Sequence, residues 1–174
     1  MSLLVVAFPI ISAKDFAWIQ SYRKVNDVLY YDVIAPHFTL VFPVFNKAAG
    51  EFIQEIEKQS TQIPAIEFEI DTAMLNKDAF KDSYHEFLVP GKGYNEIIAL
   101  HDKLYSGSLI TELRTDIEYI PHIGIGNSTE MNKCRQAVAD LNSKQIFIAG
   151  SIATLTIIEY LDNKVTTLKE IFLG

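Results

Sequence analysis

The sequence predicts an α+β protein of two related halves, with two mainly antiparallel sheets that face a central cleft and helices on the outside. Short apolar or alternating segments, typical of strands, are separated by amphipathic segments with helical spacing. The order strand, helix, strand, helix, strand occurs twice along the chain. The middle strand of each copy begins with Pro-His, at His37 and at His122, which are 85 residues apart (122 minus 37).

The expected elements follow from apolar periodicity, capping residues and turn signals. Those of the first copy are a strand at 3–10, a helix at 12–24, the His37 strand at 36–43, a helix at 47–59 and a strand at 63–75. Those of the second copy are a strand at 84–89, a helix at 94–105, the His122 strand at 121–126, a helix at about 131–141 and a strand at 151–161, which a turn at Asp162-Asn163 joins to a last strand at 165–173.

The length allows one domain with a sizeable core. A chain of 174 residues, 49% of them apolar, can bury most of its apolar surface without a disulfide or a structural metal. We expect a single two-lobed domain over residues 1–174, with sequence halves of about 1–80 and 81–174.

Charge and composition exclude several partners. A net charge of −7 argues against binding duplex nucleic acid, which depends on many Lys and Arg contacts to phosphates. No apolar run is long enough for a membrane span. The run at 3–10 has no basic segment before it and no small-residue cleavage site after it, so we interpret it as a strand. A single cysteine, Cys134, fits a buried position in a reduced protein. We expect a monomeric cytoplasmic protein.

The His37 strand carries polar chemistry on one face. Side chains alternate along a strand, so His37 and Thr39 share a face, while Phe38, Leu40 and Phe42 point the other way. If the two copies face each other, His37 and His122 come to opposite sides of one small space. Two imidazoles so placed can carry out both proton transfers of a phosphodiester cleavage, and the Thr39 hydroxyl can donate to a phosphate oxygen.

These paired motifs, in a duplicated α+β chain of this length, resemble the two-histidine phosphoesterase superfamily, which includes 2'-5' RNA ligase-like proteins and cyclic nucleotide phosphodiesterases. The resemblance covers essentially the whole chain. It implies that the two histidines, as acid and base, open a 2',3'-cyclic phosphate or a related RNA-end phosphodiester without a metal or cofactor. His37 and Thr39 match the first motif, and His122 matches the second. The implied ligand is a small phosphorylated nucleotide or an RNA end.

The second motif departs from the family, because Gly124 stands where Thr or Ser is found. Losing one donor to the transition state lowers the rate by about 10²- to 10³-fold. Three alternatives remain open. A water, a backbone N–H such as that of Gly124, or Ser128 or Thr129 replaces the donor; the pocket is reshaped for a bulkier phosphoester; or the protein binds a phosphorylated ligand without turnover.

Other polar residues are weaker candidates. Tyr84, Lys92 and Arg114 in the second half, and Arg23 and Tyr30 in the first, are candidates for additional phosphate contacts. We expect His101 and His85 to be structural. The alternating carboxylates Glu67, Glu69 and Asp71 fit a solvated strand face better than a metal site. A zinc site at the two histidines would lack its third and fourth ligands, so no metal is expected.

Overall fold

The computed structural model describes residues 1–79 and 81–174, so the boundary expected near residue 80 falls at a residue outside those described. The elements are β1 (Ser2–Ala7), β2 (Ile10–Ile11), α1 (Ala13–Asn26), β3 (Phe38–Val44), α2 (Ala49–Ser60), β4 (Ile66–Lys77), β5 (Tyr84–Lys92), α3 (Tyr94–Tyr105), a 3₁₀ turn η1 (Ile110–Glu112), β6 (Ile123–Ser128), α4 (Met131–Ser143), β7 (Ile148–Ile152), β8 (Thr154–Leu161) and β9 (Lys164–Phe172). The α+β class and the antiparallel pairing are confirmed.

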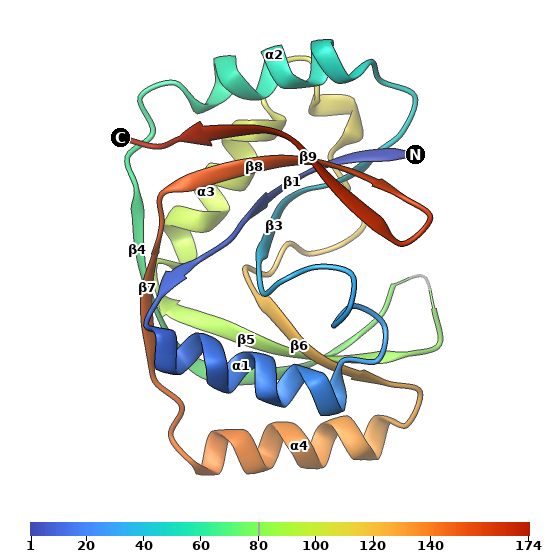
Figure 1. The fold of residues 1–174 in the computed structure, drawn as a ribbon, viewed down its shortest axis with the longest axis vertical. Helices are drawn as coiled ribbons and strands as arrows, with labels where there is room; N and C mark the ends of the chain where they lie inside the picture. Colours follow the sequence, from blue (N-terminus) through green and yellow to red (C-terminus); the bar gives the residue numbers. More distant parts are fainter. Residues whose placement is uncertain (80) are drawn as a thin grey trace.

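The strands form one curled sheet in the order β2-β7-β4-β5-β6-β3-β1-β8-β9 (Figure 1). We expected two separate sheets, and the two sets of strands are instead joined where β3 meets β6. That junction has a single register pair, Phe38 with Ile123. Because no further pair among the described residues joins these two strands, the two Pro-His motifs lie at the short junction between the two sets of strands.

Helices from each sequence half pack on the other half. Helix α1 packs against β6 and α3 packs against β3, while α4 covers β4, β5 and β6. In Figure 1, α1 and α4 lie beside β5 and β6, α2 lies at the opposite end of the molecule, and α3 runs between these two ends. The core between sheet and helices is apolar and includes Phe38, Phe52, Phe68 and Leu88.

The expected strand at 151–161 is wrong in one respect, because the segment is two strands separated by Ala153. Strand β7 pairs with β4, whereas β8 pairs with β1 on the other side of the sheet. The following turn is as expected: Asp162 and Asn163 have φ of +50° and +58°, which is typical of a two-residue hairpin turn with left-handed residues.

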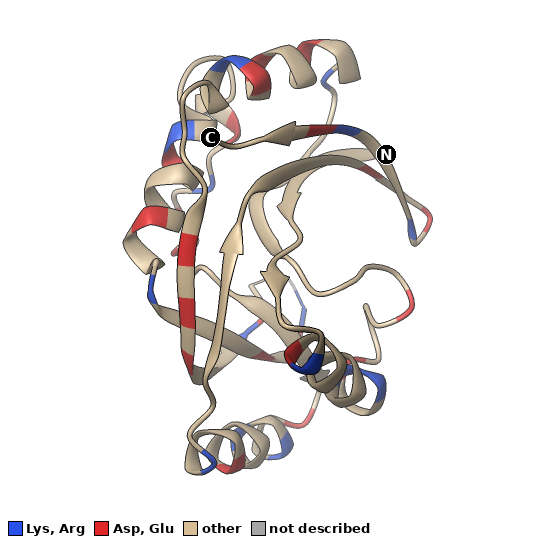
Figure 2. Cartoon of the chain, turned by 60° about the vertical axis from the view of Figure 1, so that its left-hand side comes forward, with Lys and Arg blue, Asp and Glu red and all other residues tan. Residues whose placement is uncertain are grey.

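Two other expectations concern β3 and β4. Pro43 does not end its strand, since Val44 still pairs with Leu3 of β1. Along β4, acidic positions recur on the outside of the sheet (Figure 2), where Glu67 and Asp71 are exposed and Glu69 pairs with Lys92. This agrees with a solvated face. None of the helices in the described ranges is long and apolar enough to span a bilayer.

Candidate active site

His37 and His122 each precede the first residue of a strand, β3 or β6. The antiparallel pair Phe38 with Ile123 sets their register. One step away from it on either side, His37 lies across from Gly124 and Thr39 lies across from His122. Because alternate residues share a face, these four positions form one small patch on the side of the sheet away from the buried Phe38 and Ile123.

Both imidazoles are held by the same local contact. Nδ1 of His37 lies 2.8 Å from the carbonyl oxygen of Ala35, and Nδ1 of His122 lies 2.6 Å from that of Ile120. A carbonyl only accepts, so Nδ1 carries the hydrogen in both rings. Nε2 of each neutral ring then carries a lone pair. Nε2 is therefore the atom that can accept a proton when the histidine acts as a general base.

The electrostatics keep both rings neutral in the ligand-free protein. Burial lowers the pKa of His37 to about 4, and the Arg23 guanidinium acts in the same direction. Burial also lowers the pKa of His122 to about 4, with further lowering from His37 and His85. The coupling between the two rings means that a second proton is disfavoured once the first has bound.

Two aromatic side chains that the sequence patterns did not identify contact the imidazoles. Phe87 stacks on His122 with ring centroids 3.5 Å apart and planes 17° apart. Phe8 approaches His37 edge-on at 6.2 Å. Phe87 pairs with Gly124 across β5 and β6, so it borders the patch directly. The sequence shows only that Phe87 follows His85 by two residues, on the same face of a strand, and this does not indicate that it packs on His122.

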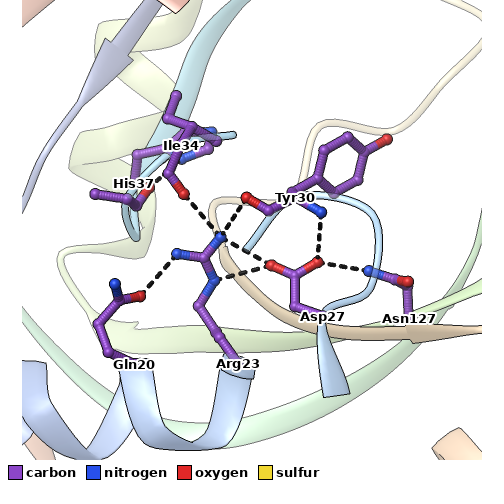
Figure 3. Close-up of polar contacts among 8 residues, drawn as sticks. Gln20, Arg23, Asp27, Tyr30, Ile34, His37 and Asn127 are labelled. Carbon is purple, nitrogen blue, oxygen red and sulfur yellow. Dashed lines mark hydrogen bonds and ion pairs between the residues drawn. The ribbon is translucent and has the colours of Figure 1, made fainter. Parts of the chain in front are cut away.

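Arg23, which we considered for a phosphate contact, is buried and holds the loop that leads to His37 (Figure 3). Its guanidinium donates to Gln20, to the Asp27 carboxylate and to the carbonyls of Tyr30 and Ile34. Asp27 also accepts from the Tyr30 main-chain N–H and from the Asn127 amide on β6. The buried pair therefore fixes the segment 27–36 relative to both α1 and β6.

Beyond Phe38, backbone groups of β3 form hydrogen bonds with side chains instead of with a neighbouring strand. The Tyr119 hydroxyl donates to the Thr39 carbonyl (3.0 Å), and His101 Nδ1 donates to the Leu40 carbonyl (2.8 Å). The Phe42 N–H donates to the Tyr105 hydroxyl (2.8 Å). The His101 and Tyr119 rings stack at 3.7 Å. His101 is buried with a backbone partner, which confirms the structural role that we expected.

The other sequence candidates have partners of their own. Lys92 is exposed and forms an ion pair with Glu69 at 2.8 Å. Arg114 binds Asp116 through two nitrogens, at 2.8 and 2.6 Å. Tyr84 begins β5 opposite Ser128, and its carbonyl accepts from the buried Cys134 thiol. His85 is paired with the Asp78 carboxylate at 2.8 Å.

Gly124 leaves open space in the patch. A Cβ built on it would meet no atom within 4 Å, and the residue is exposed. Ser128, one of the residues considered as a replacement donor, lies at the far end of β6, where its Oγ accepts from the Glu130 N–H. Among the residues that the structure describes, no group of three or more His, Cys, Asp or Glu side chains is placed to hold a metal ion.

The structure is that of an α+β protein whose curled antiparallel sheet brings two strands that begin with Pro-His together at one junction. Residues 11–164 match the model of the 2'-5' RNA ligase superfamily, and the chain belongs to that family of two-histidine phosphoesterases.

Solved structures show the same fold. Escherichia coli LigT in complex with 3'-AMP matches with a TM-score of 0.63 and 13% identity, over 99% of this chain and 97% of that one. LigT in its apo form gives 0.59 and 15%, over 99% and 96%. The protein TT0787 of Thermus thermophilus gives 0.62 and 10%, over 99% and 98%. At these identities the likeness concerns the fold. No protein with a curated description matches the sequence significantly.

Proposed function

We propose that the protein is a metal-independent phosphoesterase that hydrolyses a 2',3'-cyclic phosphate or a related RNA-end or nucleotide phosphodiester, with His37 and His122 as its acid and base. The observation that carries the proposal is the equivalence of the two rings. Each donates Nδ1–H to the carbonyl two residues before it, and the register brings both to one face at the junction of β3 and β6.

The proposed reaction needs one proton in the site. Nε2 of the neutral histidine takes a proton from water as its oxygen attacks phosphorus, and the protonated histidine gives its proton to the departing ribose oxygen. The empty site has both pKa values near 4, so the anionic substrate supplies the negative charge that favours protonation of one ring. Thr39 and the Gly124 N–H are the proposed donors to the non-bridging oxygens.

The comparisons support the ligand class. LigT, which shares the fold, has been crystallised with 3'-AMP, with ATP and with NADP⁺. A small phosphorylated nucleotide is accordingly the ligand we propose here. The second candidate is a protein that binds such a ligand without turnover, and the glycine at position 124 favours it because one hydroxyl donor is absent from the patch.

The test is hydrolysis of the four 2',3'-cyclic mononucleotides in the presence of a chelator. We expect turnover by the wild type and its loss in both His37→Ala and His122→Ala, with unchanged circular dichroism. His85→Asn removes a third histidine from outside the proposed pair and is the matched control, which we expect to remain active. Tight binding of adenosine 2'-monophosphate without hydrolysis of any cyclic nucleotide would favour the second candidate.

A further inference from the structure

A cavity of about 430 Å³ lies over β4 and β5, and the strand register places it next to the candidate active site. Its floor includes Thr72 and Met74 of β4 and Val89 of β5. Met74 pairs with Phe87, and Phe87 pairs with Gly124, so this row leads directly to the patch. Thr72 pairs with Val89. Val89 and His122 are the residues next to the pair Leu88 with Ile123, so the register sets them opposite each other. The cavity and the two histidines therefore share one face of the sheet.

The walls of the cavity come from the segment before His122 and from the start of α3. Glu118 and Ile120 line it from one side, and Tyr94 and Asn95 line it from the other. Ile120 is also the residue whose carbonyl holds His122 Nδ1. A group bonded to a phosphate at His122 consequently has this cavity as its neighbouring space, and its volume lies in the range of small-molecule sites.

The charge of the cavity is negative. Asp71 and Glu118 are among its lining residues, and none of the described lining residues is Lys or Arg. The Asp71 carboxylate is fixed in place, because it accepts from the Thr72 hydroxyl (3.0 Å) and lies against Gly91. A Cβ at Gly91 would be 2.5 Å from Asp71 Oδ2, so the glycine makes room for the carboxylate.

Two cations in neighbouring segments of the chain have carboxylate partners that do not line the cavity. Lys92, one residue beyond Gly91, is bound to Glu69, and Arg114 is bound to Asp116. A phosphate group entering the cavity would therefore meet two carboxylates. Each like charge at contact distance near a protein surface weakens binding by about fivefold or more.

We propose that the cavity is a subsite for the organic substituent of the phosphodiester, and that it accepts an uncharged or cationic group and rejects a second phosphate. This inference rests on the proposed function and narrows its substrate class. The substrate is a phosphodiester with a single negative charge, such as the cyclic phosphate of an unphosphorylated nucleoside. A polynucleotide end, whose next phosphates would extend into the cavity, is a poor substrate.

The experiment compares adenosine 2',3'-cyclic phosphate with a free 5'-hydroxyl against the same compound with a 5'-phosphate. We expect the wild type to prefer the 5'-hydroxyl compound in kcat/KM at low salt. In Asp71→Asn, Glu118→Gln and the double variant this preference decreases, by about fivefold for each charge removed, through faster turnover of the 5'-phosphate compound. Glu67→Gln removes an exposed carboxylate of β4 outside the cavity and is the matched control.

The subsite is overturned if the wild type shows no preference, if the preference persists in the double variant, or if Glu67→Gln reduces it equally. Absence of hydrolysis of both compounds by the wild type would instead contradict the proposed function. In that case calorimetric binding of adenosine 2'-monophosphate and adenosine 2',5'-bisphosphate to the same variants gives the same comparison, and equal affinities for the two ligands would overturn the subsite.

Discussion

Gly124 is the residue that the β3–β6 register sets opposite His37, one position from the Phe38–Ile123 pair, just as Thr39 is set opposite His122. Each half of the patch therefore has a histidine, but the residue two positions later is Thr39 in one half and Gly124 in the other. The space that a hydroxyl-bearing side chain would occupy at position 124 is open.

Gly124→Thr is expected to raise the rate of cyclic phosphate hydrolysis, on the order of 10²-fold in kcat, because it restores one donor to the transition state. Gly124→Val has nearly the same shape without the hydroxyl and should give no such increase. The measurement is steady-state hydrolysis of the preferred 2',3'-cyclic nucleotide. Equal rates for the Thr and Val variants would show that the hydroxyl is not the missing group.

The pH dependence follows from the lowered histidine pKa values. By NMR, His37 and His122 in the empty protein should titrate near pH 4, below the ordinary value of 6.5, and addition of adenosine 2'-monophosphate should raise at least one midpoint. The profile of kcat/KM, which reports the free protein, should have its maximum on the acidic side of pH 6.5. Titration of both rings at or above 6.5 would contradict this.

The same shifts make stability depend on pH. Below pH 6.5 the unfolded chain binds protons on these two histidines, whereas the folded chain stays neutral there until about pH 4. The unfolded state binds more protons in this window, so the free energy of unfolding decreases as the pH falls from 6.5 to 4. Urea denaturation of the wild type and of a His37→Gln, His122→Gln variant checks this, since the variant should lose less stability over the window.

Asp27→Asn should destabilise the protein by about 3–5 kcal/mol, because it leaves the buried Arg23 guanidinium without its counter-charge. The matched control is Asp116→Asn, which breaks the exposed pair with Arg114 and should hardly move the denaturation midpoint. Urea denaturation compares the two. Similar midpoints for both variants would show that the Arg23 pair does not hold the loop before His37.

Tyr119→Phe removes the donor to the Thr39 carbonyl while retaining the ring that stacks on His101. A cost of about 0.5–1.5 kcal/mol in stability is expected for the lost hydrogen bond. Because Thr39 then loses its anchor, kcat should fall more than KM changes. Tyr160→Phe removes an exposed hydroxyl bonded to Asn163 and is the control. A purely structural role for Tyr119 would lower stability and leave kcat unchanged.

Local patterns were sufficient for most of the fold. Apolar periodicity, alternation and turn signals identified the helices, most strands and the Asp162-Asn163 turn, because those signals act within a few residues. The break at Ala153 was not predictable from local patterns. It arises because the residues before it pair with β4 and the residues after it pair with β1, and both strands are distant in the sequence. Phe87 and Tyr119 were missed for the same reason, as their partners are 35 and 80 residues away (122 minus 87; 119 minus 39).

Arg23 shows how a charge near a motif can mislead. A cation at the end of the helix that precedes the His37 strand was a candidate for a phosphate contact. The folded chain shows that Arg23 is 1% exposed and that its guanidinium donates to Gln20, to Asp27 and to two carbonyls. Residue type and sequence position do not show whether a cation is buried and holds the backbone of a loop, because this depends on the packing of the folded chain.

The single residue between β7 and β8 also limits how the molecule can move. Ala153 connects a strand paired with β4 to one paired with β1, so the two distant parts of the sheet are tethered by one residue. Hinge-like swinging of these parts would require ladder hydrogen bonds on one side of the tether to break. Amide exchange across Ile152 and Leu155, which are both fully buried, should therefore be as slow as in the deepest core.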